Sequence, residues 1–144
     1  MTDKIIENNS ALERGLAEEK SKAGKRNRRK GSEFEKRVRD NLRDAGWLVF
    51  KNDNQVWLDK DPIEFDKAKM SWNPFRKSLV VGAGFPDFVC IGMAKFGVKF
   101  VEAKLHGLTS HEEKIKAAWI KENLKIPIFV AFLDKNDNLT YKEL

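Results

Sequence analysis

The sequence is poor in cysteine, histidine and long apolar runs, and each shortage excludes a class of protein. Its 144 residues include one cysteine and two histidines. A single cysteine cannot form an intrachain disulfide, and so few thiols and imidazoles leave no spacing typical of a zinc site. No apolar run approaches the roughly 18 residues that a membrane-spanning helix needs. The polar N-terminus does not resemble a secretory signal, so we expect a cytoplasmic protein without a membrane partner.

Positive charge is concentrated in one short stretch, residues 20–30, which we name the basic segment. The whole chain has a net charge of +6. The basic segment alone carries +7 and no acid, so the rest of the chain sums to −1; its cations are Lys20, Lys22, Lys25, Arg26, Arg28, Arg29 and Lys30. Such a cluster is typical of proteins that bind a polyanion. The alternative is a disordered basic tail exposed to solvent.

Residues 1–30 are expected to form a basic N-terminal arm, and residues 31–144 a single domain. One weak amphipathic helix is indicated in the arm, with apolar positions at Ile5, Ile6, Leu12 and Leu16. Gly15 and Gly24 interrupt this pattern. The arm is therefore expected to be partly helical or flexible.

A capping box predicts that a helix begins directly after the arm. Ser32 stands three residues before Glu35, the spacing at which an N-cap hydroxyl and a carboxylate satisfy the first N–H groups of a helix. Apolar residues then recur every four positions, at Phe34, Val38 and Leu42. This period predicts a helix over residues 32–45, ended by Gly46. The apolar residues 47–50 predict the first strand.

Two later apolar runs, residues 85–91 and 97–103, predict a β-hairpin whose connection is 92–96. A second capping-box pattern at residues 109–112 predicts a helix through about Asn123, with an apolar face at Ile115, Ala118, Trp119 and Leu124. The continuous apolar run at 127–133 is typical of a buried strand. A turn over 134–138 and a short edge strand at 139–141 follow.

Three charged residues stand out on the predicted hairpin. Asp87 lies on its first strand, while Glu102 and Lys104 lie at the end of its second strand. Residues two apart on a strand share a face, so Glu102 and Lys104 are expected to point the same way, with Asp87 beside them. Burying charge costs free energy unless the charge is paired or binds a metal. The group is therefore either a structural ion pair or a divalent-metal site of the kind that Mg²⁺ forms with carboxylates, waters and phosphates.

Pro86-Asp87, then 14 residues, then Glu102-Ala103-Lys104 resembles the motif of the PD-(D/E)xK nuclease superfamily. The resemblance implies that Asp87 and Glu102 are metal ligands and that the Ala103 carbonyl is a third. It also implies that Lys104 lies near the attacking water. The implied cofactor is Mg²⁺, with Mn²⁺ as a substitute.

The beginning of the domain resembles one branch of that superfamily, the archaeal Holliday-junction resolvases. The resemblance rests on Arg29-Lys30-Gly31-Ser32 followed by Glu35, a helix, Gly46 and a strand. It implies that Glu35 joins the metal site, whereas the local pattern alone indicates helix capping. In related nucleases the second helix places a polar side chain near the metal, which implies Glu113 or Lys114 here. Gly84-Phe85-Pro86-Asp87 is also similar to the opening of the virus-type nucleases.

Residues 52–81 depart from the resolvase pattern and form an insertion. They combine several lysines with aromatic residues, among them Trp57, Phe65, Trp72 and Phe75. Interleaved aromatic and cationic side chains can stack on bases and hold phosphates. The alternative is a small hydrophobic flap that packs on the core or on a second subunit.

The expected fold is α/β, with a mixed sheet flanked by helices, a basic arm and an insertion. The hairpin is antiparallel, and a helix between two successive strands predicts parallel pairing of those strands. This order matches the αβββαβ core of restriction-endonuclease-like proteins, as the resemblance implies.

The expected function is that of a metal-dependent DNA endonuclease, and the resemblance implies branched or structured DNA as substrate. Phosphate contacts are expected from Lys25, Arg26, Arg28, Arg29, Lys30 and Arg37. One alternative is a restriction-type or repair-type nuclease of the same superfamily, and another is a non-catalytic nucleic-acid-binding protein on the same fold. DNA is the expected partner, and a homodimer is an open alternative to a monomer.

Overall fold

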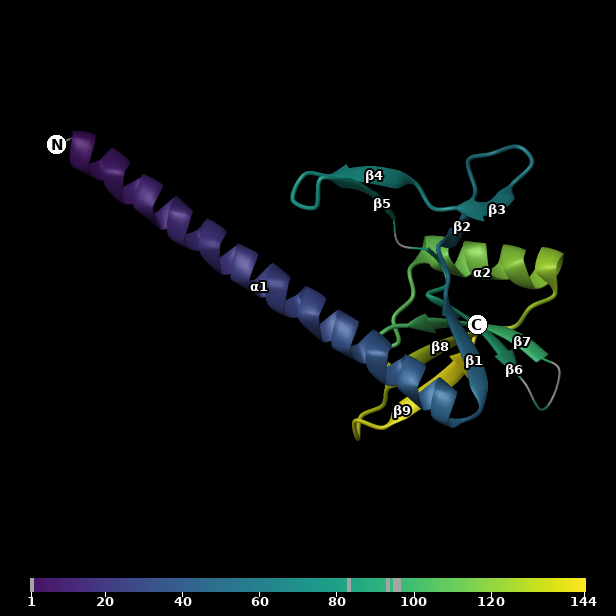
Figure 1. Ribbon diagram of the computed structural model, residues 1–144. Helices are drawn as coiled ribbons and strands as arrows, with labels where there is room; N and C mark the ends of the chain where they lie inside the picture. Colours follow the sequence, from purple (N-terminus) through teal and green to yellow (C-terminus); the bar gives the residue numbers. More distant parts are fainter. Residues whose placement is uncertain (1, 83, 93, 95–96) are drawn as a thin grey trace. The chain divides into compact units, whose positions relative to one another are not determined.

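The structure is a computed structural model that describes residues 2–82, 84–92, 94 and 97–144 (Figure 1). The chain divides into two units, Met1–Phe34 and Glu35–Leu144. The second unit contains the sheet and every residue of the candidate site described below. Within the described part of the chain, no helix is long and apolar enough to cross a membrane.

The first helix, α1 (Thr2–Asp44), is one continuous element of 43 residues. It passes through Ser32, so the predicted helix start and capping box at that residue are wrong. The lysines, arginines and glutamates on either side of Ser32 are good helix formers, and an ion pair between Arg29 and Glu33 (2.9 Å) joins adjacent turns across it. Gly15 and Gly24 lie inside the helix without interrupting it. The predicted end is confirmed: Gly46 follows with a positive φ of 88°.

A mixed five-stranded sheet forms the centre of the second unit, in the order β1-β6-β7-β8-β9. Its strands are β1 (Trp47–Lys51), β6 (Phe88–Gly92), β7 (Gly97–Ala103), β8 (Ile128–Leu133) and β9 (Leu139–Glu143). Neighbours are antiparallel except β7 and β8, whose parallel pairing confirms the prediction. The first strand of the hairpin begins at Phe88 rather than at the predicted Phe85. Residues 93, 95 and 96 of its connection lie outside the described residues.

The two faces of the sheet carry different helices. Phe100 and Ile128 are buried in a core that also contains Ala117 and Ile120 of α2 (His111–Leu124). On the opposite face Tyr141 donates a hydrogen bond to Asn41 Oδ1 of α1, at 2.7 Å. Side chains alternate along strands, which is why successive residues serve the two layers. The predicted α/β class with a mixed sheet and helices on both faces agrees with this arrangement.

Helix α2 begins one residue later than the predicted capping pattern. Ser110, not Thr109, is the N-cap residue. The buried face of α2 consists of Ala117 and Ile120, and Trp119 packs partly against the core. The predicted face was therefore wrong at three positions that are exposed, namely Ile115, Ala118 and Leu124. A period of 3.6 predicts that a stripe exists, but the position of the sheet selects which stripe is covered.

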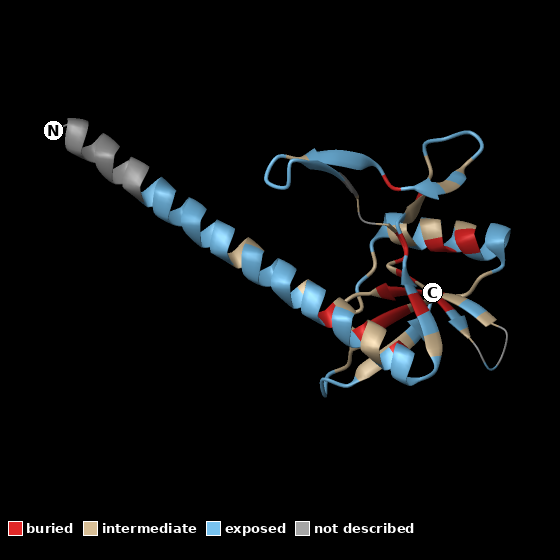
Figure 2. Ribbon diagram, viewed as in Figure 1, coloured by how far each residue is buried: buried red, intermediate tan, exposed pale blue. Residues whose placement is uncertain are grey.

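The insertion folds into two hairpins of different character. In the first, β2 (Asn54–Trp57) pairs with β3 (Glu64–Lys67), Val56 is buried, and the ring of Phe65 meets that of Phe100 edge-on at 5.8 Å. In the second, β4 (Met70–Asn73) pairs with β5 (Ser78–Val81). Figure 2 shows most of β4 and the loop after it as exposed. Packing on the core thus describes the first hairpin, whereas the side chains described in the second are exposed or, at Asn73, partly exposed.

Candidate active site

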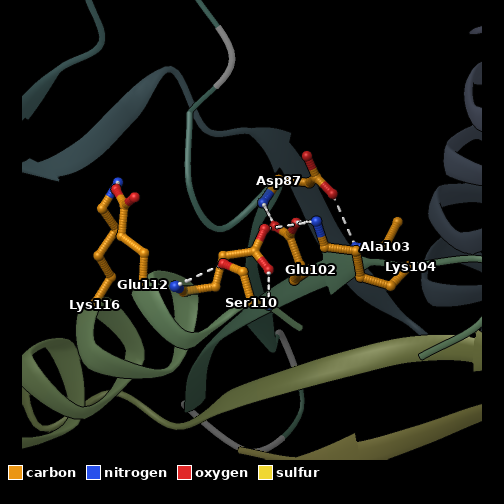
Figure 3. A network of polar contacts seen from close by, with 8 residues as sticks. Asp87, Glu102, Ala103, Lys104, Ser110, Glu112 and Lys116 are labelled. Carbon is orange, nitrogen blue, oxygen red and sulfur yellow. Dashed lines mark hydrogen bonds and ion pairs between the residues drawn. The ribbon is translucent and has the colours of Figure 1, made fainter. Parts of the chain in front are cut away.

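A hollow of about 400 Å³ lies beside the end of β7 and the beginning of α2. Its wall contains five carboxylates and two lysines, contributed by both helices, by β7 and by the segment before β6: Glu35, Asp87, Glu102, Lys104, Glu112, Glu113 and Lys116. Figure 3 shows Asp87, Glu102 and Lys104 close together, with Glu112 and Lys116 as a separate pair on α2. The structure therefore brings together the predicted residues Glu35, Asp87, Glu102 and Lys104, which are up to 69 positions apart in the sequence.

Asp87 and Glu102 are linked by a reciprocal pair of hydrogen bonds. The backbone N–H of Asp87 donates to Glu102 Oε2 at 3.1 Å. The backbone N–H of Ala103 donates to Asp87 Oδ2 at 2.8 Å (Figure 3). Each carboxylate thus accepts a bond from the main chain of the other's segment, and Glu102 is only 5% exposed. The two carboxylates are fixed side by side at the edge of the core.

Asn52 holds the backbone on which Asp87 stands. Asn52 is buried, its N–H donates to the Asp87 carbonyl at 2.8 Å, and its Nδ2 donates to the Pro86 carbonyl at 2.7 Å. Gly84 permits this approach, because a Cβ there would lie 2.1 Å from the Asn52 carbonyl oxygen. Pro86 has no N–H to donate to a β-ladder, which fits the start of β6 at Phe88. The nuclease-like motif contains no signal for Asn52, since the contact spans 34 residues.

Lys104 is shared between two carboxylates. Its Nζ lies 2.6 Å from Glu113 Oε1 and 3.2 Å from Glu102 Oε1. Glu113 also completes a capping box: its Oε2 accepts the Ser110 N–H at 2.7 Å, and Ser110 Oγ accepts the Glu113 N–H at 3.1 Å. Of the two residues implied for the second helix, the structure places Glu113 in the wall of the hollow, whereas the exposed Lys114 is not among the described wall residues.

Positive charge neutralises one carboxylate of the hollow, Glu113, more fully than it neutralises Asp87 and Glu102. Burial, and then the charge of Asp87, raises the pKa of Glu102 to about 8. Burial also raises the pKa of Asp87, despite its bond from Ala103. Burial alone would raise the pKa of Glu113, but its bonds to Lys104 and Ser110 outweigh this and lower it. Lys104 therefore compensates Glu113 best and leaves the Asp87–Glu102 pair short of positive charge.

Glu35 faces the hollow from α1. Its Oε2 accepts a hydrogen bond from Lys51 Nζ at 3.2 Å, and both side chains are partly exposed. The charge of Glu35 contributes to the raised pKa of Asp87, after burial as the main cause. Because α1 continues on both sides of Glu35, its carboxylate is not used for helix capping.

The donor set of the hollow fits a hard divalent cation. Among the described residues, no group of three or more His, Cys, Asp or Glu side chains is arranged as a metal site. Asp87 and Glu102 nevertheless supply two adjacent carboxylates, the number that Mg²⁺ commonly takes from a protein while waters and substrate phosphates complete its six ligands. Oxygen donors of this kind suit Mg²⁺ or Mn²⁺.

The predicted phosphate-binding residues are exposed cations. Lys25, Arg26, Arg28, Arg29 and Lys30 belong to the first unit, where Arg28 Nε also donates to the Gly24 carbonyl at 3.4 Å. Arg37 belongs to the second unit and donates to the Asp137 carbonyl at 3.2 Å. Arg37 thus has a structural contact in the turn before β9 that the sequence pattern did not indicate.

No family model, no curated protein and no solved structure matches this chain. The functional argument therefore rests on the geometry and charge of the hollow.

Proposed function

We propose that the chain is a divalent-metal-dependent endonuclease that hydrolyses phosphodiester bonds in DNA, with the hollow as its active site. The supporting observation is the adjacent Asp87–Glu102 pair: Lys104, which contacts Glu102 at 3.2 Å, lies closer to Glu113, at 2.6 Å. Two adjacent carboxylates, one buried and one partly buried, repel each other and are costly to ionise. A divalent cation between them would offset this cost, and a protein that only bound DNA would gain nothing from carboxylates that repel phosphate.

Asp87 and Glu102 would hold Mg²⁺ or Mn²⁺ through their carboxylates, with the Ala103 carbonyl as a further oxygen and Glu35 in the wall of the same hollow. When bound, the ion supplies Lewis acidity toward a water and toward the phosphate. Asn52 and the Ala103 N–H keep the Asp87 carboxylate in place. This positioning matters because small displacements at a metal site reduce its affinity and activity.

Lys104 would act as a fixed positive charge. Burial alone would lower its pKa, but its bonds to Glu113 and Glu102 outweigh burial and raise it. A lysine held protonated in this way donates hydrogen bonds and does not accept a proton at neutral pH. We therefore assign Lys104 to orienting the attacking water or a phosphate oxygen, with Glu113 holding its ammonium group in place.

The basic segment supports DNA as the polyanion. Exposed lysines and arginines on one helix supply affinity for phosphates but little sequence information. Branched or structured DNA is the part of the proposal that comes from the resemblance to junction resolvases.

A cleavage assay tests the proposal. The protein is incubated with four-way, flap, single-stranded and linear duplex DNA, with Mg²⁺ or with chelator, alongside Asp87→Asn and the control Asp59→Asn. Asp59 is an exposed carboxylate in the turn of the first hairpin. We expect cleavage of at least one substrate by the wild type and the control, and none with chelator or with Asp87→Asn. Failure of folded wild-type protein to cut any substrate with Mg²⁺ or Mn²⁺ would contradict the proposal.

A further inference from the structure

The second hairpin of the insertion exposes an apolar face. Trp72 and Leu79 are directly paired across β4 and β5, and Met70 lies two residues from Trp72, so the three side chains share one face. The exposed fractions of Trp72, Leu79 and Met70 are 61%, 60% and 48%. Ser71 and Ser78 on the other face are exposed as well. Isolated two-stranded hairpins are marginally stable in water, so an apolar face this open indicates a surface that a partner covers.

The tip of the same hairpin presents an aromatic ring between cations. Phe75 is 96% exposed, and Arg76 and Lys77 follow it directly. Asn73 fixes the backbone of the tip, because its Oδ1 accepts the N–H groups of Phe75 and Arg76, both at 3.0 Å. An exposed ring on a fixed turn, next to two cations, is the combination that stacks on a base and contacts its phosphates.

The two hairpins differ in charge, and this difference indicates the kind of partner that the second hairpin binds. Residues 53–67, which contain the first hairpin, carry five acids and two lysines. Residues 68–86, which contain the second, carry three cations and no acid: Lys69, Arg76 and Lys77. The segment that bears the exposed apolar face is thus positively charged, which complements a polyanion. A two-fold contact between copies of this face would instead bring two sets of three cations together.

The second hairpin is also close to the hollow along the chain. β5 ends at Val81, and Gly84 lines the hollow three residues later. Three residues span at most about 11 Å. A strand of DNA bound at the base of this hairpin therefore lies within a few nucleotides of Asp87.

We infer that the β4–β5 hairpin binds unpaired bases of a DNA substrate, with Trp72 and Phe75 stacking on bases and Arg76 and Lys77 contacting phosphates. The inference rests on the proposed function in one respect, that DNA is the substrate. Base faces are covered in a continuous duplex and accessible in a single strand, so the substrate class is DNA with a single-stranded segment next to the cleaved bond.

Fluorescence anisotropy with a labelled oligo-dT strand and a labelled duplex, both in chelator, tests this inference. The variants are Trp72→Ala and Phe75→Ala, and the control is Phe50→Ala, a half-exposed aromatic residue on β1. Removing one stacking ring is expected to weaken oligo-dT binding at least about 5-fold in each variant. Duplex binding is expected to change less than about 2-fold, because non-specific phosphate contacts remain in place. The control is expected to bind both DNAs as the wild type does.

A second measurement keeps the test valid where Trp72→Ala fails to fold. Trp72→Phe retains a stacking ring, so we expect it to bind oligo-dT with wild-type affinity while showing less of the tryptophan quenching that DNA binding causes. Arg76→Gln is expected to lower the slope of log K against log salt by about 0.7 for the single strand.

The outcomes separate this inference from the proposed function, because binding is measured without metal. Weakened oligo-dT binding in the stacking variants supports the inference even where the wild type cuts no DNA, a result that would contradict the proposed function alone. Wild-type oligo-dT affinity in both alanine variants overturns the inference. A change of oligomeric state in sedimentation, with unchanged DNA binding, also overturns it and assigns the face to contacts between copies.

Discussion

The basic segment and the hollow differ in how their charges are held. In the basic segment the cations are exposed along one helix, and the ion pair of Arg29 with Glu33 is itself largely exposed. In the hollow Glu102 is buried and Asp87 is partly buried, and both accept hydrogen bonds from backbone N–H groups. Exposed charges interact weakly, are screened by salt and tolerate many geometries. Buried carboxylates have fixed positions and altered pKa values, so affinity for DNA and chemistry on DNA are expected to depend on separate residues.

The largest expected effect follows from neutralising the Asp87–Glu102 pair. Asp87→Asn and Glu102→Gln should each abolish detectable cleavage, and Lys104→Ala should do the same. DNA binding by the two carboxylate variants in chelator should stay unchanged or become tighter, because a group that repels phosphate is removed. Gel-based cleavage and anisotropy measure the two properties on the same samples. Near wild-type Mg²⁺-dependent cleavage by any one variant would remove that residue from the proposed site.

The reverse result is expected for the basic segment. Five substitutions to glutamine keep good helix formers in place while removing charge: Lys25→Gln, Arg26→Gln, Arg28→Gln, Arg29→Gln and Lys30→Gln. Removing one phosphate contact lowers the slope of log K against log salt by about 0.9 for duplex DNA, so the combined decrease should approach about 4.5. Cleavage at saturating protein should persist. An unchanged slope would show that these cations do not contact DNA.

Glu35 tests whether a half-buried charge takes part in cleavage, because its side chain is half-buried and lies on the wall of the hollow. Glu35→Gln should reduce cleavage at limiting Mg²⁺ about 10-fold, in line with perturbation of a metal site. Its ion pair with Lys51 is partly exposed, so the melting temperature should remain close to that of the wild type. Glu33→Gln, two residues earlier on α1, is the matched control. Equal activity in both variants would leave Glu35 without a role in cleavage.

The smallest expected effect is a pH dependence of stability without metal. Folding raises the pKa of Glu102 from its ordinary 4.5 to about 8, chiefly through burial. The folded state therefore binds this proton more tightly than the unfolded state does. Its stabilising contribution is fully present below pH 4.5 and disappears as the pH rises toward about 8. Melting temperatures in chelator should decline over this range, and the decline should be shallower in Glu102→Gln. An equally steep decline in the variant would contradict the assignment.

The fold was predictable where a single pattern determined the structure. The apolar runs at 47–50, 97–103 and 127–133 correspond to strands, and the helix between the last two predicted their parallel pairing. The two predicted capping boxes had different outcomes. The one predicted at residues 109–112 lies one residue later, at Ser110 and Glu113, where residues 105–110 are not helical. Ser32 and Glu35 form none, because the helix formers before them continue α1.

The alternation of side chains along strands predicted the part of the candidate site that the hairpin contributes. Glu102 and Lys104 lie on the same side of the end of β7, and the hairpin register brings Asp87 to them. The structure adds the supporting contacts, namely Asn52 behind Asp87 and Glu113 behind Lys104. These contacts depend on a hydrogen bond over 34 residues and on the start of α2 at one particular residue. Local sequence patterns do not specify either.

A calorimetric titration with Mn²⁺ tests the central claim, that Asp87 and Glu102 hold the divalent cation on which cleavage depends. The samples are wild-type protein, Asp87→Asn, Glu102→Gln and the exposed control Asp59→Asn. Mn²⁺ shares the preference of Mg²⁺ for carboxylate oxygens. We predict a saturable binding heat for the wild type and Asp59→Asn, and its disappearance in Asp87→Asn and Glu102→Gln. The same binding heat in Asp87→Asn as in the wild type would contradict the account.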